Sequence, residues 1–131
     1  MKEFKFNRIG LCLNPNVPVK EGIPLRYGAI MIETAEYKPG KWYVGRDYFV
    51  TTWGGSFGCF HSKNRESFKS EKEAVWKTLQ GVIDDCESRI VLEEGTGDED
   101  FNPKKVKKFI RRLKHLQKDF NYREPSLFDW E

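Results

Sequence analysis

Two segments in the first half of the chain alternate apolar and polar side chains with the two-residue period of a half-buried β-strand. Residues 27–37 carry Ile30 and Ile32 on one parity, and residues 42–53 are rich in the aromatic and β-branched side chains that suit a pleated surface. The Lys-Pro-Gly sequence at residues 38–40 predicts a turn between them. The two segments are therefore expected to pair as antiparallel strands.

Glycines set the limits of the predicted sheet. The glycine within residues 45–47 is expected to interrupt the second strand as a bulge or tight turn, and the glycine-rich segment 53–58 predicts a hairpin or bulge. Residues 57–61 and 65–68 can each add a short strand. The pattern predicts an antiparallel meander of three to five strands.

The first 26 residues are predicted to form a loop-rich N-terminal arm. Residues 4–6 and 9–13 are apolar enough for a short strand or two. Three prolines and a glycine between residues 15 and 24 then indicate a loop, because these residues break regular pairing.

The first predicted helix spans residues 70–91. It starts with a capping box, in which Ser70 accepts hydrogen bonds from the first-turn amides and Glu73 reaches back toward the cap. Apolar residues then recur at helical spacing, so one face of the helix is expected to lie on the sheet. They are Val75, Trp76, Leu79, Val82, Ile83, Cys86 and Ile90.

A second helix is predicted at residues 102–120, after a solvated loop at residues 93–100 that is rich in glycine and acidic residues. Asn102 suits the N-cap, and Pro103 suits the first helical position, where its missing amide hydrogen costs nothing. Apolar residues line one side of this helix. They are Val106, Phe109, Ile110, Leu113, Leu116 and Phe120.

These elements predict a single α+β domain over residues 27–121, with the first helix on the sheet, the second packed nearby, and a flexible peptide tail at 122–131. The chain has 131 residues, of which 38% are hydrophobic, which is enough for one core and too few for two. It has no apolar run long enough for a membrane span or a signal peptide, so a cytoplasmic location is expected. Cys12, Cys59 and Cys86 form no Cys-x-x-Cys pair, so we expect buried thiols and neither a metal nor a cofactor.

The outer face of the second helix is strongly basic, although the formal net charge of the whole chain is only +3. Such a stripe can bind nucleic-acid phosphates by sequence-independent attraction. Alternatively, it is a solvated face that the acidic loop before it neutralises. The candidate nucleic-acid-binding residues are Lys104, Lys105, Lys107, Lys108, Arg111, Arg112, Lys114 and Lys118.

The C-terminal tail places Leu127, Phe128 and Trp130 in an otherwise charged segment, which indicates docking either onto the domain itself or onto a partner. Residues 124–128, Glu-Pro-Ser-Leu-Phe, resemble the peptide with which bacterial DNA polymerases, repair proteins and mobile-element proteins bind the replication sliding clamp, commonly written Gln-Leu-Ser/Asp-Leu-Phe.

The resemblance implies that Leu127 and Phe128 fill an apolar pocket on the clamp and that Ser126 lets the peptide turn in. Glu124 and Pro125 depart from the usual Gln and Leu. Proline restricts the unbound tail to extended conformations, which lowers the cost of ordering it.

Aromatic residues of the strands and a histidine supply weaker functional hypotheses. Exposed aromatic side chains would stack on bases, whereas buried ones would belong to the core. The residues concerned are Trp42, Tyr43, Tyr48, Phe49 and Trp53. An enzyme would require a cleft that gathers Arg46, Asp47, Cys59 or His61, and no local spacing favours one.

Two wider resemblances involve the middle of the chain. Residues 48–55, followed by Phe-Lys-Ser-x-x-Glu-Ala at residues 68–74, resemble the WGR domain of DNA-damage enzymes, although Gly55 stands where that domain has its arginine. Residues 27–131 as a whole resemble small uncharacterised proteins of plasmids and phages. The second resemblance implies a mobile-element or genome-maintenance setting.

We therefore expect a non-enzymatic adaptor of DNA replication, repair or mobile-element maintenance, which binds the sliding clamp through Leu127 and Phe128 while its basic helix contacts DNA. The alternative is a nucleic-acid-binding module that uses the basic helix and an aromatic sheet, with the tail folded back on the core. Deletion of residues 123–131 separates the two hypotheses, because only the second requires a loss of stability.

Overall fold

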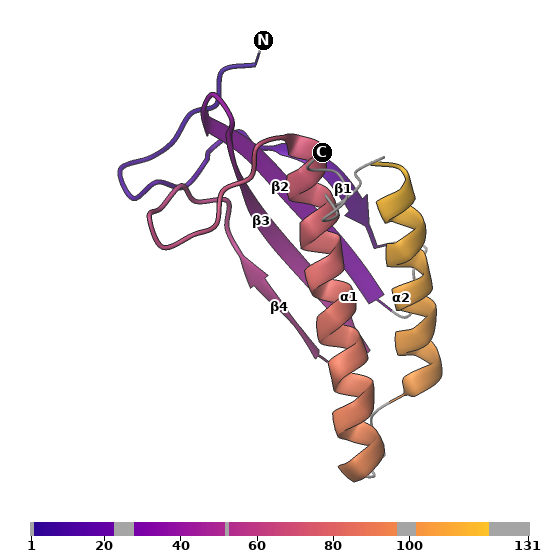
Figure 1. Cartoon of the computed structure of the whole chain (residues 1–131). Coiled ribbons are helices and arrows are strands. Elements are labelled where there is room, and N and C mark those ends of the chain that lie inside the picture. The colour runs from indigo at the N-terminus through magenta and orange to yellow at the C-terminus, as the bar shows by residue number, and fades with distance from the viewer. Residues whose placement is uncertain (1, 23–27, 52, 97–101, 121–131) are drawn as a thin grey trace, which may run out of the picture.

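The computed structural model describes residues 2–22, 28–51, 53–96 and 102–120, and for residues 93–96 it describes the backbone. These residues form four strands and two helices (Figure 1). The elements are β1 (Asn16–Glu21), β2 (Gly28–Lys38), β3 (Lys41–Val50), β4 (Trp53–Phe57), α1 (Glu71–Thr96) and α2 (Pro103–Lys118).

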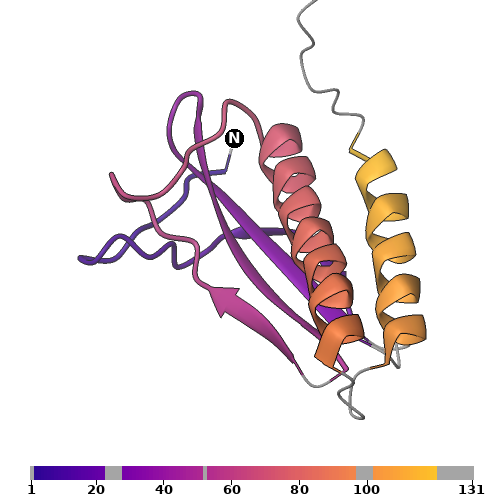
Figure 2. The ribbon, with the colours of Figure 1, turned by 60° about the horizontal axis from the view of Figure 1, so that its bottom comes forward.

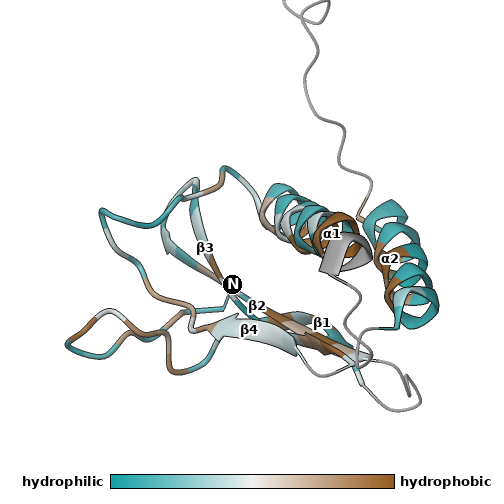
Figure 3. Ribbon diagram, turned by 90° about the horizontal axis from the view of Figure 1, so that it is seen from below, coloured by the Kyte–Doolittle hydropathy of each residue, from teal (hydrophilic) through white to brown (hydrophobic). Residues whose placement is uncertain are grey.

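The fold is α+β, as the sequence predicts. All four strands pair antiparallel with their neighbours in chain order, β1-β2-β3-β4, which is the predicted meander. The helices run side by side in opposite directions (Figures 1 and 2), and both cover the same face of the sheet (Figure 3). The domain therefore has two layers.

The long β2–β3 hairpin forms the centre of the sheet. Its pairing runs without a register shift from Gly28 opposite Val50 to Glu36 opposite Trp42, so the predicted interruption at residues 45–47 is wrong. Gly45 serves a different purpose. A Cβ there would lie 2.6 Å from the backbone nitrogen of Cys59, so only glycine lets the chain after β4 cross this strand so closely.

Strand β1 lies where the sequence predicts a loop. It pairs with β2 at the edge of the sheet, with Asn16 opposite Thr34 and Val19 opposite Ile32. The register shifts between these pairs, which is the signature of a β-bulge, and Pro18 lies within it. Proline lacks an amide hydrogen, so a bulge in an edge strand is a position where it disturbs no ladder.

Strand β4 begins earlier than predicted. Trp53 pairs with Val50, so the glycine-rich segment is itself a strand in a tight hairpin, and residues 57–61 do not form the separate strand that the sequence predicts. The turn places Thr51 at a φ of 57°, the left-handed region. Of residues 65–68, only Phe68 makes a bridge, to Trp42.

Helix α1 begins at the predicted capping box. The amide of Glu73 donates to Oγ of Ser70 at 3.1 Å, and the carboxylate of Glu73 accepts from the amide of Lys69, one residue before the cap, at 3.1 Å. The helix continues to Thr96, so the prediction of a loop from residue 93 is wrong for residues 93–96. Glutamate has a good helix propensity, which lets the helix extend into this acidic segment.

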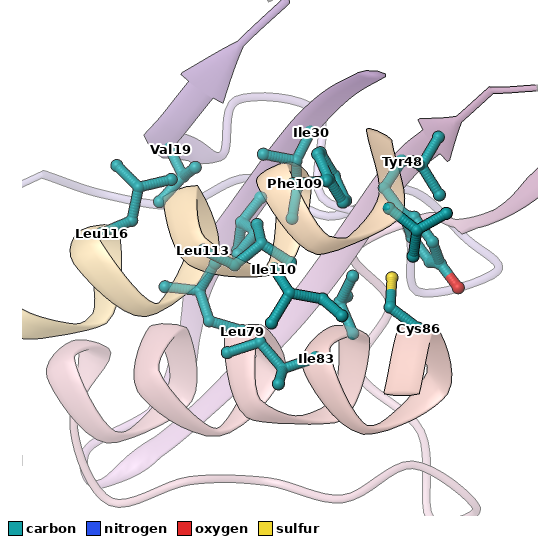
Figure 4. Packing of buried hydrophobic residues seen from close by; sticks show 14 of the residues in the cluster. Val19, Ile30, Tyr48, Leu79, Ile83, Cys86, Phe109, Ile110, Leu113 and Leu116 are labelled. Atoms are coloured by element: carbon teal, nitrogen blue, oxygen red, sulfur yellow. The ribbon is translucent and has the colours of Figure 1, made fainter. Parts of the chain in front are cut away.

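Helix α2 matches its prediction closely. Asn102 is the N-cap and its side chain accepts from the amide of Lys105 at 3.2 Å, while Pro103 occupies the first turn. Its apolar side enters the main core between α1 and the sheet (Figure 4), and Gln117 donates to the backbone oxygen of Trp76 at 3.2 Å. The central core residues are Ile30, Ile32, Val50, Val75, Leu79, Val82, Ile83, Val106, Phe109 and Leu113.

A second, smaller core lies on the face of the sheet away from the helices. Cys12 from the N-terminal segment and Cys59 from the segment after β4 pack with Ala35 and Tyr43, and Phe4 packs against them. The N-terminal arm therefore covers one half of this face. Toward the other end, Phe49 remains 52% exposed.

Candidate nucleic-acid interface

The basic residues predicted on the second helix lie on the outer side of α2. Figure 3 shows hydrophilic residues along this side, and the apolar side faces α1 and the sheet. Arg112 is half-buried, and the other predicted residues are exposed. The exposed ones are Lys104, Lys105, Lys107, Lys108, Arg111, Lys114 and Lys118.

Two of the predicted nucleic-acid-binding residues make contacts within the protein. Arg112 forms a two-pronged ion pair with Glu21 of β1, in which its Nε lies 3.0 Å from Oε2 and its Nη2 donates to Oε1. Lys114 lies 3.5 Å from the Oε1 of Glu87 on α1. The Arg112 pair fastens α2 to the edge of the sheet, so this residue is part of the scaffold as well as of the basic face.

The remaining cations form a surface that the described carboxylates do not neutralise. Within the described ranges, none of these six side chains has an ion-pair partner. They are Lys104, Lys105, Lys107, Lys108, Arg111 and Lys118. The acidic side chains of residues 93–100, which the solvated-face alternative requires, lie outside the described part of the structure. We call these six side chains the α2 basic face.

A groove of about 520 Å³ runs beside the basic face, between the two helices. It is lined by the apolar side chains of Ile90 and Ile110, by Lys107 and Arg111, and by the Lys114–Glu87 ion pair. The cations therefore border a hollow and are not spread over a flat surface.

Of the two alternatives for the aromatic residues of the strands, the structure favours the core over base stacking for most of them. Tyr43 and Tyr48 are buried, and Trp42 and Trp53 are half-buried. Burial, together with the nearby carboxylate of Asp85, raises the pKa of the Tyr48 hydroxyl to about 12. Tyr48 belongs to the main core and Tyr43 to the second core, because alternate positions of β3 face opposite sides of the sheet, and Trp53 of β4 packs against the main core.

Phe49 is the aromatic residue of the predicted group that stays exposed. It lines an open hollow of about 520 Å³ with Ala29 and Met31 on the uncovered half of the second face. Asp47 and Glu21 line that hollow with a single cation, Lys20, so its charged side chains do not favour phosphate. One aromatic beside an acid gives little support to base stacking on the sheet.

The residues considered for an enzyme are not brought together. Arg46 pairs with Asp85 of α1 at 3.5 Å on the helix side, whereas Asp47 faces the opposite side of the sheet. His61 stacks on Tyr37 with ring centroids 3.6 Å apart. Cys59 is fully buried, and burial raises its pKa to about 12, which leaves the thiol protonated and unreactive at neutral pH.

The predicted partner-binding residues Glu124, Pro125, Ser126, Leu127, Phe128 and Trp130 lie outside the described residues. Cys12, Cys59 and Cys86 are buried free thiols, as predicted. The described ranges hold no cluster of three His, Cys, Asp or Glu side chains able to bind a metal.

Neither described helix combines the length and the hydropathy required to cross a membrane. No protein-family model, curated protein or solved structure matches the chain. The resemblances to WGR domains and to plasmid and phage proteins stay predictions.

Proposed function

We propose that the domain binds nucleic acid, with DNA as its expected target, through the phosphate backbone and by means of the α2 basic face. The observation that carries this proposal is the separation of roles on one helix. Val106, Phe109 and Leu113 are fully buried, while the six cations of the basic face project outward without ion pairs among the described residues. Packing fixes the position of the helix, and the six cations remain available to bind phosphates.

The spacing of the cations suits an extended anionic partner. Residues three, four and seven apart share a helix face, and Lys104, Lys107, Arg111 and Lys118 follow that spacing. A helix of 16 residues is about 24 Å long, so the stripe extends along several phosphates of a nucleic-acid backbone. Binding of this kind is independent of sequence and weakens steeply with salt.

Fluorescence anisotropy with a random-sequence duplex, measured across a range of salt concentrations, tests the proposal. The variant Lys107→Gln/Arg111→Gln removes two phosphate contacts, so it should weaken binding and reduce the slope of log K against log salt by about 1–2. The control Lys69→Gln/Lys72→Gln removes the same charge from exposed positions at the start of α1. Equal effects of the two variants, or no binding by the wild type, would refute the proposal.

A second candidate function is binding of the bacterial sliding clamp by residues 124–128. The observation in its favour is that the main core forms between the sheet and both helices from residues 19–116. The described domain therefore has its own hydrophobic core, and Leu127 and Phe128 are not required to supply it. A tail bound to the clamp would hold the domain close to DNA. The basic face would then bind that DNA with a higher effective affinity.

Titration of a bacterial clamp with the wild type and with Leu127→Ala/Phe128→Ala tests this candidate, alongside thermal melts of both proteins. Binding by the wild type alone, with equal melting temperatures, supports a clamp adaptor in a replication, repair or mobile-element setting. A lower melting temperature of the variant, without clamp binding by either protein, would assign the tail to the core.

A further inference from the structure

A cavity of about 630 Å³ lies between the β2–β3 turn and the segment of residues 61–67. Small-molecule sites usually have volumes of roughly 300–1,000 Å³, so the cavity has a suitable size. Its lining includes four cationic side chains and no acidic residue. The cations are Lys38, Lys41, Lys63 and Arg65.

Two of these lysines face each other directly. Lys38 and Lys41 are Cα partners in the β2–β3 ladder, where like charges destabilise a hairpin. The Glu36 carboxylate in the same turn accepts a hydrogen bond from the amide of Gly40 at 3.1 Å. The Lys38–Lys41 pair places two positive charges close together at the end of the hairpin. A bound anion would relieve the repulsion between them.

Contacts within the protein hold the guanidinium of Arg65 in place. Its Nη1 donates to the backbone oxygen of Gly58 at 2.8 Å, and its guanidinium lies 4.8 Å from the ring centroid of Phe57 and 5.3 Å from that of Phe60. A guanidinium fixed in this way loses little entropy when its remaining N–H groups bind phosphoryl oxygens. The Ser62 and Ser67 side chains, which also line the cavity, add hydroxyl donors.

The aromatic rings of the cavity wall already pack against other side chains of the protein. Tyr37 has His61 stacked on one side, at an interplanar angle of 6°, and Lys38 lies 5.5 Å from its ring centroid. Phe6 packs edge-on against His61 at 5.0 Å, which fixes the stack. The cavity therefore suits recognition of a charged group and not of an aromatic one.

We propose that this cavity, formed by Tyr37, Lys38, Lys41, His61, Lys63 and Arg65, binds the diphosphate group of a small phosphorylated molecule. Two adjacent phosphoryl groups carry the concentrated negative charge that a lining with four cations and no acid favours. The site lies beside the β2–β3 turn, on the side of the sheet where Tyr43 joins the second core, and it shares no residue with the α2 basic face. It is independent of the proposed nucleic-acid binding.

Isothermal titration calorimetry of the full chain with inorganic pyrophosphate tests the site. Lys41→Gln/Lys63→Gln changes two exposed residues and should weaken binding at least about tenfold, because each lost charge-assisted hydrogen bond is costly. Lys69→Gln/Lys72→Gln, with the same change of net charge, should change the affinity less than about twofold. Arg65→Lys keeps the charge but loses the fork geometry, and it should also weaken binding.

Three further ligands show which chemical group the cavity recognises. ADP should bind about as well as pyrophosphate, while adenosine should not bind and orthophosphate should bind more weakly. Binding of adenosine in place of pyrophosphate, equal losses in the pocket and control variants, or no heat with pyrophosphate at low millimolar concentration would each overturn the proposal. Because Lys107→Gln/Arg111→Gln leaves the cavity intact, it should bind pyrophosphate like the wild type, so this proposal and the nucleic-acid proposal fail separately.

Discussion

The hydroxyl of Thr34, in the middle of the sheet, donates a 2.7 Å hydrogen bond to Oε2 of Glu71, in the first turn of α1. The side-chain amide of Asn16 donates to the same oxygen at 2.8 Å. Thr34 is fully buried. One carboxylate oxygen therefore joins β1, β2 and α1 where the helix starts.

Replacement of Glu71 should lower the free energy of unfolding. Glu71→Ala leaves the buried hydroxyl of Thr34 without its acceptor, which should cost about 1–3 kcal/mol in urea denaturation. Glu3→Ala, at an exposed position, is the control. If Glu71→Ala costs as much in the Thr34→Val background as it does in the wild type, the carboxylate's role does not require the Thr34 bond.

Arg112 and Lys108 should respond differently to the same substitution, although both belong to the basic helix. Arg112→Gln breaks the ion pair with Glu21 and should destabilise the protein by about 1 kcal/mol, whereas Lys108→Gln at an exposed position should stay within about 0.5 kcal/mol of the wild type. Chemical denaturation measures both. Equal stabilities would mean that the Arg112–Glu21 pair contributes nothing to the docking of α2.

A substitution in the β3–β4 turn should make the protein more stable. Thr51 has a φ of 57°, which is unfavourable for a β-branched residue, and its hydroxyl oxygen is buried without a hydrogen-bond partner among the described residues. Thr51→Gly should therefore raise the free energy of unfolding by about 1 kcal/mol, which a thermal melt detects. Thr51→Ala removes the hydroxyl and keeps a Cβ, so a larger gain from alanine than from glycine would contradict backbone strain as the cause.

Stability should fall as the pH rises above about 9. Burial raises the pKa of the Cys59 and Cys86 thiols from 9.0 to about 12 in the folded protein, so the unfolded chain loses these protons first. Their contribution is complete below pH 9 and decreases up to pH 12.

Denaturation midpoints measured from pH 8 to pH 11 test the thiol effect. Cys59→Ala/Cys86→Ala should be less stable at pH 8, since it leaves space in both cores, and its decline with pH should be shallower than that of the wild type. Parallel declines would show that other groups, such as Tyr48 with its raised pKa of about 12, dominate the titration.

The elements that the sequence predicts correctly depend on local signals. The cap at Ser70 and the Asn102-Pro103 pair act within one turn of helix. The apolar positions around Ile30 and Ile32 show the two-residue period of a strand within a single segment. Strand β1 is different. Pro18 breaks strands in general, and it is tolerated here because a bulge against β2 removes the need for its amide.

The two proposed sites also differ in whether their residues are close together in the sequence. The α2 basic face can be predicted because its cations and its apolar side share one helix. The diphosphate cavity joins the turn at Lys38 and Lys41 to Lys63 and Arg65, which the path of the chain after β4 brings close. Gly45 permits that path, and the sequence alone indicates a bulge there.

The strictly sequential pairing of the strands affects how the chain folds during synthesis. Because each strand pairs with the next, the sheet needs only short loop closures and can form as soon as Phe57 has left the ribosome. Helix α1 follows first, and the apolar face at Ile30 and Val50 is fully covered only when Phe109 of α2 follows. At usual translation rates this interval lasts roughly 3–10 s, and during it the nascent protein is most exposed to aggregation and most dependent on chaperones.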